Sequence, residues 1–214
     1  MSKVLKGKRK AKDEYRHGSL KMALMQAAIH SIQQTGEVEF SLRELAAAVG
    51  VSHAAAYRHF KSKKEILFDL AREGFDRLNV SFSQILDKDP GDIVSLGVAY
   101  VTFAAENPIY FKIMFHPDLK IDSSHPELIS VGSKTFLYLK ECVRINKENG
   151  IFSDISVENL SLTAWSTVHG LAVLCVNGNL SPLPDGNHIT VVNTSKIVAR
   201  VLVDGLLRRS SKRE

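Results

Sequence analysis

Side chains that commonly carry out chemistry are few in this chain, and they do not pair at productive spacing. Cys142 and Cys175 lie outside any C-x-x-C pair, so neither a disulfide framework nor a zinc-binding pair is expected. Four histidines occur singly, without an H-x-x-x-H or Cys–His pair: His116, His125, His169 and His188. We therefore predict no metal, no cofactor and two reduced cysteines, which fits a cytoplasmic protein.

Catalytic and membrane motifs are missing from the sequence as well. It contains no Gly-rich phosphate loop, no G-x-S-x-G element and no cluster of His, Cys and Asp at catalytic spacing. No apolar run approaches the roughly 18 residues that span a bilayer, and the densest stretch, residues 170–176, is too short. The basic N-terminus is not followed by an apolar stretch, so no secretory signal is expected. We expect neither an enzyme nor a membrane protein.

Positive charge is concentrated in the first third of the chain. The first 64 residues contain 13 Lys and Arg against 5 Asp and Glu, a balance of +8, whereas the remaining 150 residues have a balance of −3. A polyanion-binding head on a nearly neutral body gives this distribution. A basic disordered tail gives the same sum. We expect residues 1–16 to form such a tail, either as an arm that touches phosphates or as a solvated segment without a role.

Residues 42–60 have the spacing of two short helices joined by a tight turn. Ser41 and Glu44 form a capping box, which satisfies backbone N–H groups at a helix start. The apolar face that follows ends at Gly50, and Ser52 can cap a second helix over residues 53–60. A second capping box, Ser62 with Glu65, opens a long helix to about residue 86. Together with a packed helix from about residue 20 to the stop at Gly36, this is a helix-turn-helix arrangement.

An α-helix fits the major groove of DNA and can present polar side chains to base edges. The expected second helix has polar residues for that purpose at His53, Arg58 and His59, while Ala56 and Phe60 can anchor it. Tyr57 has two open interpretations, because it can be a core anchor or a DNA contact. The sequence therefore predicts that this element binds double-stranded DNA.

The same residues resemble the signature of the TetR family of transcriptional regulators in type, order and spacing. The matching segments are Leu42-Arg43-Glu44-Leu45-Ala46, Val49-Gly50-Val51-Ser52 and Tyr57-Arg58-His59-Phe60-Lys61-Ser62-Lys63-Lys64-Glu65-Ile66-Leu67. The resemblance implies an all-α homodimer whose two heads enter successive major grooves of a palindromic operator. Carried over by position, it implies that these residues face DNA: Arg43, Ser52, His53, Ala55, Tyr57, His59 and Lys63.

One departure from the family pattern affects which bases are read. Many relatives have Gly or Thr at positions 54–56, where this chain has three alanines. Alanines cannot donate hydroxyl hydrogen bonds, so readout shifts toward thymine methyl groups or DNA shape. The resemblance therefore leaves the operator sequence open.

Further helical segments follow the head, with breaks at residues 87–91, 116–124 and 178–188. The expected helices are 92–106, 109–115, 126–149, 156–177 and 190–208, and no segment has sustained strand alternation. We predict an all-α fold of about nine helices. Its parts are the basic tail (residues 1–16), a DNA-binding domain (17–64) and a ligand-binding and dimerisation domain (65–214).

Aromatic and methionine side chains gather in one stretch of the expected body. They are either simple core or the lining of an effector pocket, since apolar pockets are lined in this way: Tyr100, Phe103, Phe111, Met114 and Phe115. Trp165 and His169 share a helix face and belong to a W-x-x-x-H-G element, which resembles the WHG class of TetR C-terminal domains. His169 is either a polar contact for an effector or a hydrogen-bonded core histidine. We interpret Gly170 as a site of close helix packing.

The last helix is apolar on a broader face than one small monomer would bury. Pairing with a second copy into a four-helix bundle would cover it, and burial within the chain is the alternative. The predicted interface residues are Val191, Val198, Val201 and Leu202. The sequence as a whole predicts a bacterial repressor that a small apolar effector releases from its operator. Two alternatives stay open: an effector-independent or architectural DNA-binding protein, and a helical enzyme or binding protein with a vestigial head.

Overall fold

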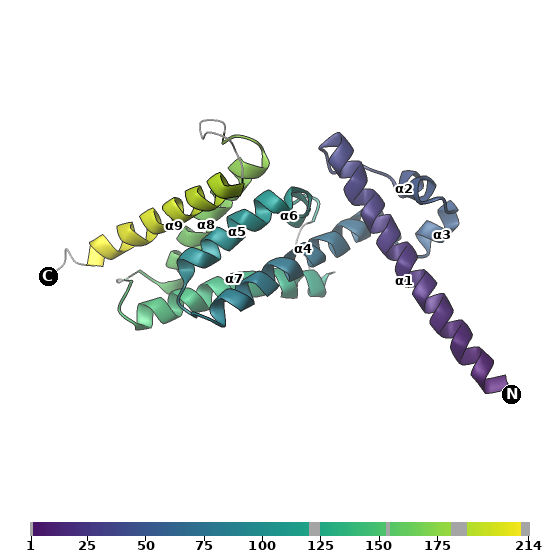
Figure 1. The fold of residues 1–214 in the computed structure, drawn as a ribbon, viewed down its shortest axis with the longest axis horizontal. Helices are drawn as coiled ribbons and strands as arrows, with labels where there is room; N and C mark the ends of the chain where they lie inside the picture. Colours follow the sequence, from purple (N-terminus) through teal and green to yellow (C-terminus); the bar gives the residue numbers. More distant parts are fainter. Residues whose placement is uncertain (1, 120–124, 153–154, 181–187, 211–214) are drawn as a thin grey trace. The chain divides into compact units, whose positions relative to one another are not determined.

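The computed structural model describes residues 2–119, 125–152, 155–180 and 188–210, with side chains described for 19–119, 125–152, 155–180 and 190–206. These described residues form nine α-helices and no strand (Figure 1). The predicted all-α fold of about nine helices is therefore confirmed. The chain divides into a head unit, residues 2–70 with 115–119, and a body unit, residues 71–114 with the described residues from 125 onward.

The head unit consists of α1 (Ser2–Thr35), α2 (Leu42–Val49), α3 (His53–Tyr57) and the first two turns of α4 (Lys63–Leu86). Helices α1, α2 and α3, which follow one another in the chain, pack against one another. The buried apolar side chains of the head unit include Leu24, Ala28, Ile32, Leu45 and Phe60. The head unit ends at Leu70, further along the chain than the predicted boundary at residue 64, since Ile66, Leu67 and Leu70 are buried as well.

The N-terminal helix is longer than the sequence predicts. Residues 1–16 were expected to be disordered, whereas α1 begins at Ser2; residue 1 and the side chains up to residue 18 lie outside the described part. Lys, Arg, Ala and Leu, which dominate residues 3–12, have good intrinsic helix propensity even without an apolar face. Hydrophobic periodicity, the signal used to predict helices, does not detect such a segment.

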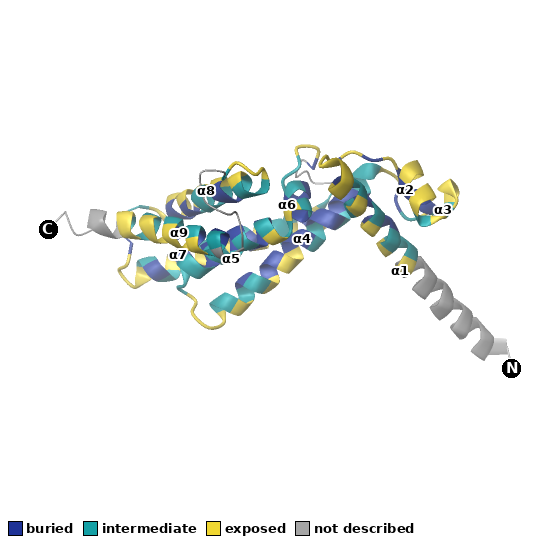
Figure 2. Ribbon diagram, turned by 45° about the horizontal axis from the view of Figure 1, so that its top comes forward, coloured by how far each residue is buried: buried dark blue, intermediate teal, exposed yellow. Residues whose placement is uncertain are grey.

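The body unit contains the rest of α4 together with α5 (Ile93–Glu106), α6 (Pro108–Met114), α7 (Pro126–Glu148), α8 (Val157–Val176) and α9 (His188–Ser210). Helix α5 packs against α6, α7, α8 and α9, and it carries no charged residue before Glu106. A helix that is apolar all round belongs inside a fold. Its buried residues are visible along α5 in Figure 2.

Local signals in the sequence set most helix ends. Gly50 and Gly150 have φ angles of 74° and 73°, the left-handed region that glycine adopts without a Cβ clash, and they follow α2 and α7 as predicted. Asp92 and Ser156 cap α5 and α8, accepting hydrogen bonds from Ser95 N at 2.9 Å and Asn159 N at 3.2 Å. The predicted bounds of these helices therefore agree with the structure within a few residues.

A buried polar link joins α4 to α7. The Asn79 amide donates to the Val131 carbonyl at 3.0 Å, and the Thr135 hydroxyl donates to Asn79 Oδ1 at 2.8 Å. Asn79 and Thr135 are both buried, so their hydrogen bonds offset the cost of removing polar groups from water. This pair fixes the register of the two helices.

Helix α8 corrects the expectation that no segment is long and apolar enough to span a membrane. Residues Val157–Val176 meet that test by length and composition, and a third of the window is buried. Polar residues interrupt the apolar run, so a search for uninterrupted apolar stretches does not find it. The buried side of α8 packs against α5 and α7, as in a core helix that passes the same test.

Candidate functional site

The first helix of the predicted helix-turn-helix is held by a complete capping box. The Ser41 hydroxyl accepts from Glu44 N at 3.2 Å, and the Glu44 carboxylate accepts from Ser41 N at 2.7 Å. The Ser41 hydroxyl also donates to Glu44 Oε2 at 2.9 Å, and the bonds that the carboxylate accepts, first from the Ser41 backbone and then from its side chain, lower the pKa of Glu44. The box therefore fixes the start of α2 as the sequence predicts.

The turn between α2 and α3 depends on Gly50 and Ser52. Gly50 N donates to the Ala47 carbonyl at 3.1 Å, and Val51 N donates to the Ala46 carbonyl at 2.9 Å, which closes the end of α2. The Ser52 hydroxyl then accepts from Ala55 N at 3.2 Å and caps α3. Helix α3 is shorter than the predicted 53–60, because it ends at Tyr57 and the chain turns at Arg58.

Helix α3 is anchored through Ala56 and Phe60, which are fully buried. Tyr57, one position after Ala56, points elsewhere and is 45% exposed, with its ring edge-on to His53 at 4.5 Å between centroids. Of the two interpretations of Tyr57, the structure excludes the core anchor. His53, Tyr57 and Arg58 thus form an exposed polar and aromatic face.

The other predicted DNA-facing residues lie around this face in the head unit. Arg43 and Ser52 are exposed, while Ala55, His59 and Lys63 are half-buried. Arg58 is an exposed cation that the family carry-over did not include. Arg58 directly follows Tyr57 at the end of α3, and this position identifies it as a candidate DNA contact.

Lys63 already has partners within the chain, which the sequence did not reveal. Its ammonium lies 2.9 Å from Glu39 Oε2 and 5.6 Å from the centre of the Phe40 ring. The Glu39 side chain is 72% exposed, so this ion pair is a weak one that solvent screens. A phosphate can therefore compete with Glu39 for Lys63.

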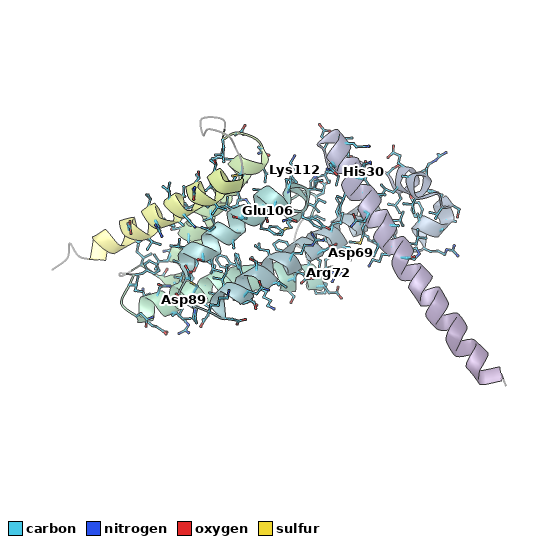
Figure 3. The ribbon with its side chains drawn as sticks, viewed as in Figure 1. His30, Asp69, Arg72, Asp89, Glu106 and Lys112 are labelled. Atoms are coloured by element: carbon cyan, nitrogen blue, oxygen red, sulfur yellow. The ribbon has the colours of Figure 1, made fainter. Side chains whose placement is uncertain are left out.

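The start of α4 is held to α1 by a second ion pair. Lys21 lies 2.6 Å from Asp69 Oδ2, and its ammonium lies 5.5 Å from the centre of the Phe60 ring. Asp69 is on α4, where Figure 3 labels it. The Lys21 ammonium therefore contacts both Asp69 of α4 and the ring of Phe60. These contacts hold Phe60, which follows α3, in place.

A second group of functional candidates lies in the body unit, where α5, α6 and α8 meet. The Tyr100 hydroxyl is 2.8 Å from His169 Nδ1, and Trp165 Nε1 donates to the same hydroxyl at 3.5 Å. Phe111 adds a ring 5.9 Å from Tyr100 and 5.5 Å from His169, measured between centroids. We refer to Tyr100, Phe111, Trp165 and His169 as the aromatic cluster.

Proton positions in the aromatic cluster follow from burial. Burial raises the pKa of Tyr100, against a smaller opposing effect of the Trp165 hydrogen bond, and burial lowers the pKa of His169. Tyr100 is therefore a neutral phenol, and its hydroxyl shares a hydrogen bond with His169 Nδ1. This hydrogen bond favours the interpretation of His169 as a hydrogen-bonded residue of the body.

The structure brings together only part of the predicted pocket lining. Phe103 and Met114 are buried in the body unit, and a Cβ at Gly74 would lie 2.6 Å from the Met114 sulfur, so Met114 marks the close approach of α4 and α6. Phe115 belongs to the head unit instead. Phe136 on α7, which the sequence prediction missed, lies 5.9 Å from the Trp165 ring.

The predicted interface residues on α9 differ in exposure. Val191 is buried within its own chain, as the alternative of intrachain packing requires, and Val198 and Leu202 are half-buried. Val201 is 66% exposed, and Ile197, one turn earlier, is 63% exposed. The expectation for Gly170 is corrected as well: a Cβ there would meet no atom within 4 Å among the described residues, so Gly170 is not a site of close helix packing within that part of the chain.

Comparison with protein families identifies both units. The family described as bacterial regulatory proteins, tetR family, matches residues 24–70, and the tetracycline repressor-like C-terminal domain matches residues 93–190. The chain belongs to the TetR family. It is therefore a DNA-binding transcriptional regulator, and the family is one of regulators rather than enzymes.

Individual relatives of this TetR-family protein have modest sequence identity. The HTH-type transcriptional regulator YobS of Bacillus subtilis strain 168 is 28% identical over 161 residues, which are 74% of this chain and 80% of that protein. A Rhodococcus sp. RHA1 protein of known structure and unknown function is 26% identical, with a TM-score of 0.74 and coverage of 90% and 98%. FadR of Bacillus subtilis, solved with stearoyl-CoA, has the same fold at 15% identity, with a TM-score of 0.68 and coverage of 86% and 98%.

Proposed function

We propose that this TetR-family regulator is a cytoplasmic homodimeric repressor that binds a palindromic operator and is released by a small apolar effector. The observation that carries the DNA-binding part is the exposed face of α3, where His53, Tyr57 and Arg58 extend from a helix anchored by Ala56 and Phe60. Such a short, fixed helix can enter the major groove. No catalytic activity is part of the proposal.

DNA binding is tested by fluorescence anisotropy with the DNA upstream of the protein's own gene and an unrelated fragment of equal length. We expect His53→Ala and Tyr57→Ala to lower affinity for the upstream fragment by about tenfold or more, since a base contact contributes about 1–3 kcal/mol. Lys134→Gln on α7 removes an exposed body cation and is the control. Equal affinity of the unaltered protein for both fragments, in the presence and absence of candidate effectors, would favour a vestigial head.

The aromatic cluster is the proposed effector site. Its rings offer apolar contact area to an effector, and the half-buried Trp165 and His169 side chains form its partly exposed side. FadR of Bacillus subtilis, a relative in fold, was solved with stearoyl-CoA, which supports a ligand with a substantial apolar part. Helix α4 belongs to both units, so a shift of its body part would be transmitted to the head.

Effector binding is tested by thermal unfolding with an apolar ligand library that includes stearoyl-CoA. A ligand that raises the unfolding temperature of the unaltered protein should act less on Trp165→Ala and His169→Ala, while Leu137→Ala, an exposed site on α7, keeps the full response. If the ligand raised the unfolding temperature of both cluster variants as much as that of the unaltered protein, the aromatic cluster would not be the effector site. If no ligand in the library acts, the effector-independent alternative is favoured.

A further inference from the structure

The body unit has a concave feature on the side of α5 that faces away from the aromatic cluster. It is a groove of about 530 Å³ between α5 and α9, and Ile85 in the last turn of α4 also lines it. Its α5 side is formed by Val94, Ser95, Val98, Ala99 and Thr102, whereas Tyr100 of the aromatic cluster is buried on the opposite side of the same helix. The groove is therefore distinct from the proposed effector site.

The floor of the groove is mostly apolar. Val94, Val98 and Ala99 of α5 form it together with the small polar Ser95, and Val192 of α9 faces them across the groove. A helix side next to solvent normally carries charged residues, but α5 has none before Glu106. The volume lies within the range of about 300–1,000 Å³ that is usual for small-molecule sites. An apolar ligand segment fits this floor.

The rim of the groove is cationic. Lys196 and Arg200 are four residues apart on α9, so they share one side of that helix, and both are exposed. Neither makes an ion pair within the part of the chain whose side chains are described. Two cations beside an apolar floor favour an anion, and a guanidinium matches a carboxylate in geometry.

The acidic residue of the groove does not cancel this charge. Asp92 lies at the N-cap of α5, and its Oδ1 accepts from Ser95 N at 2.9 Å. The positive end of the helix dipole therefore stabilises its negative charge. No ion pair joins Asp92 to Lys196 or Arg200 among the described side chains, so both cations are available to a ligand.

The direction of the two helices gives the groove a polarity. Helices α5 and α9 run antiparallel, as Figure 1 shows, so Arg200 lies toward the start of α5 and Val192 lies toward Thr102. The Thr102 hydroxyl is inaccessible and has no hydrogen-bond partner among the described residues. From Val94 to Thr102, α5 rises by about 12 Å. This length suits an alkyl chain of medium length whose charged end is at Arg200 and Lys196.

We propose that the α5–α9 groove binds an amphipathic anion, a medium-length alkyl chain that ends in a carboxylate. The carboxylate pairs with Lys196 and Arg200, and the alkyl chain covers Val94, Val98, Ala99 and Val192. Ile197 and Val201, the exposed apolar residues of α9, are each one position further along and lie about 100° around the helix from Lys196 and Arg200.

The test is calorimetric titration of the full-length protein with decanoate, decanol and decyltrimethylammonium. Decanoate should bind at least about tenfold more tightly than decanol, because decanol lacks the charge. Decyltrimethylammonium should not compete with decanoate for the groove. Lys196→Gln with Arg200→Gln should weaken decanoate binding at least about tenfold and leave decanol unchanged. Ala99→Phe, which fills the floor, should weaken both.

Matched variants distinguish the groove from a diffuse charge effect and from the aromatic cluster. Lys134→Gln with Arg144→Gln removes two exposed cations of α7 and should leave decanoate affinity unchanged, as should His169→Ala in the aromatic cluster. Equal affinity for decanoate and decanol, or equal losses in both charge variants, would overturn the proposal. A loss only in His169→Ala would assign decanoate to the aromatic cluster instead. Conversion of a dimer to a monomer by the Lys196 and Arg200 changes would make the groove a protein interface, which also overturns it.

Discussion

At the scale of single residues, the hydrogen bonds of Tyr100 hold the aromatic cluster together. Trp165 donates to its hydroxyl, and the same hydroxyl lies 2.8 Å from His169 Nδ1. Burial favours the neutral form of His169, because a charged imidazolium loses hydration there. The W-x-x-x-H-G spacing predicted that Trp165 and His169 share a helix face, but their partner Tyr100 lies 65 and 69 residues away and only the fold brings it close.

We predict that His169 makes the body less stable in acid. Burial lowers its pKa below the ordinary value of 6.5, so the unfolded chain takes up a proton at higher pH than the folded chain does. The contribution of His169 is therefore fully present above about pH 6.5 and falls as the pH drops toward its folded pKa. Urea unfolding of the unaltered protein and His169→Gln on both sides of that pH should show a smaller acid loss in the variant. The same loss in both proteins would contradict a neutral His169.

We also predict opposite effects on DNA affinity from the two members of the Lys63–Glu39 ion pair. Lys63→Gln should weaken binding to specific and unrelated DNA alike, and lower the slope of log affinity against log salt by about 0.9, as for one lost phosphate contact. Glu39→Gln frees Lys63 and removes a negative charge, so it should strengthen binding. Anisotropy over a salt series measures both. A weaker complex with Glu39→Gln would mean that the ion pair positions Lys63 for DNA.

At the scale of helices, the sequence predicted what local interactions control. Capping at Ser41, Asp92 and Ser156, and the left-handed glycines Gly50 and Gly150, involve residues within a few positions of one another. The extension of α1 to Ser2 and the early end of α3 were missed, because propensity and the turn at Arg58 leave no periodic apolar signal. The Lys63–Glu39 pair, the place of Phe136 and the α5–α9 groove depend on packing between distant segments, which periodicity does not report.

Two glycine substitutions should have opposite effects on stability, for reasons that differ only in backbone conformation. At Gly50 a Cβ has open space, but φ is 74°, so Gly50→Ala should destabilise the head by about 1–2 kcal/mol. At Gly170 a Cβ also has open space and the backbone is helical, so Gly170→Ala should stabilise the monomeric body by about 1 kcal/mol. Denaturant unfolding of each variant measures the difference. Loss of stability in Gly170→Ala at high protein concentration only would place Gly170 in an interface between copies.

At the scale of the whole molecule, the proposed binding to a palindromic operator requires two heads, and exposed apolar residues of the body provide the proposed means of pairing. Ile197 and Val201 are one turn apart on α9, and Leu174 on the neighbouring α8 is 43% exposed. Exposed apolar side chains on adjacent helices favour association with an identical surface of a second copy. In the proposed dimer, both heads bind one palindromic operator, which raises the affinity for DNA above that of a single head.

We predict that Ile197→Glu with Val201→Glu produces a monomer. Two glutamates on the proposed interface would be buried against their symmetry mates without partners, a cost that exceeds the gain from pairing. Analytical ultracentrifugation should show half the mass of the unaltered protein, while circular dichroism shows unchanged helix content, because both residues are exposed in a single chain. Operator affinity should fall by at least about a hundredfold, since one head alone makes half of the contacts. Leu137→Glu, at an exposed leucine on α7, is the matched control and should stay dimeric. A monomer from Leu137→Glu, or a dimer from the two α9 changes, would place the interface in another part of the body.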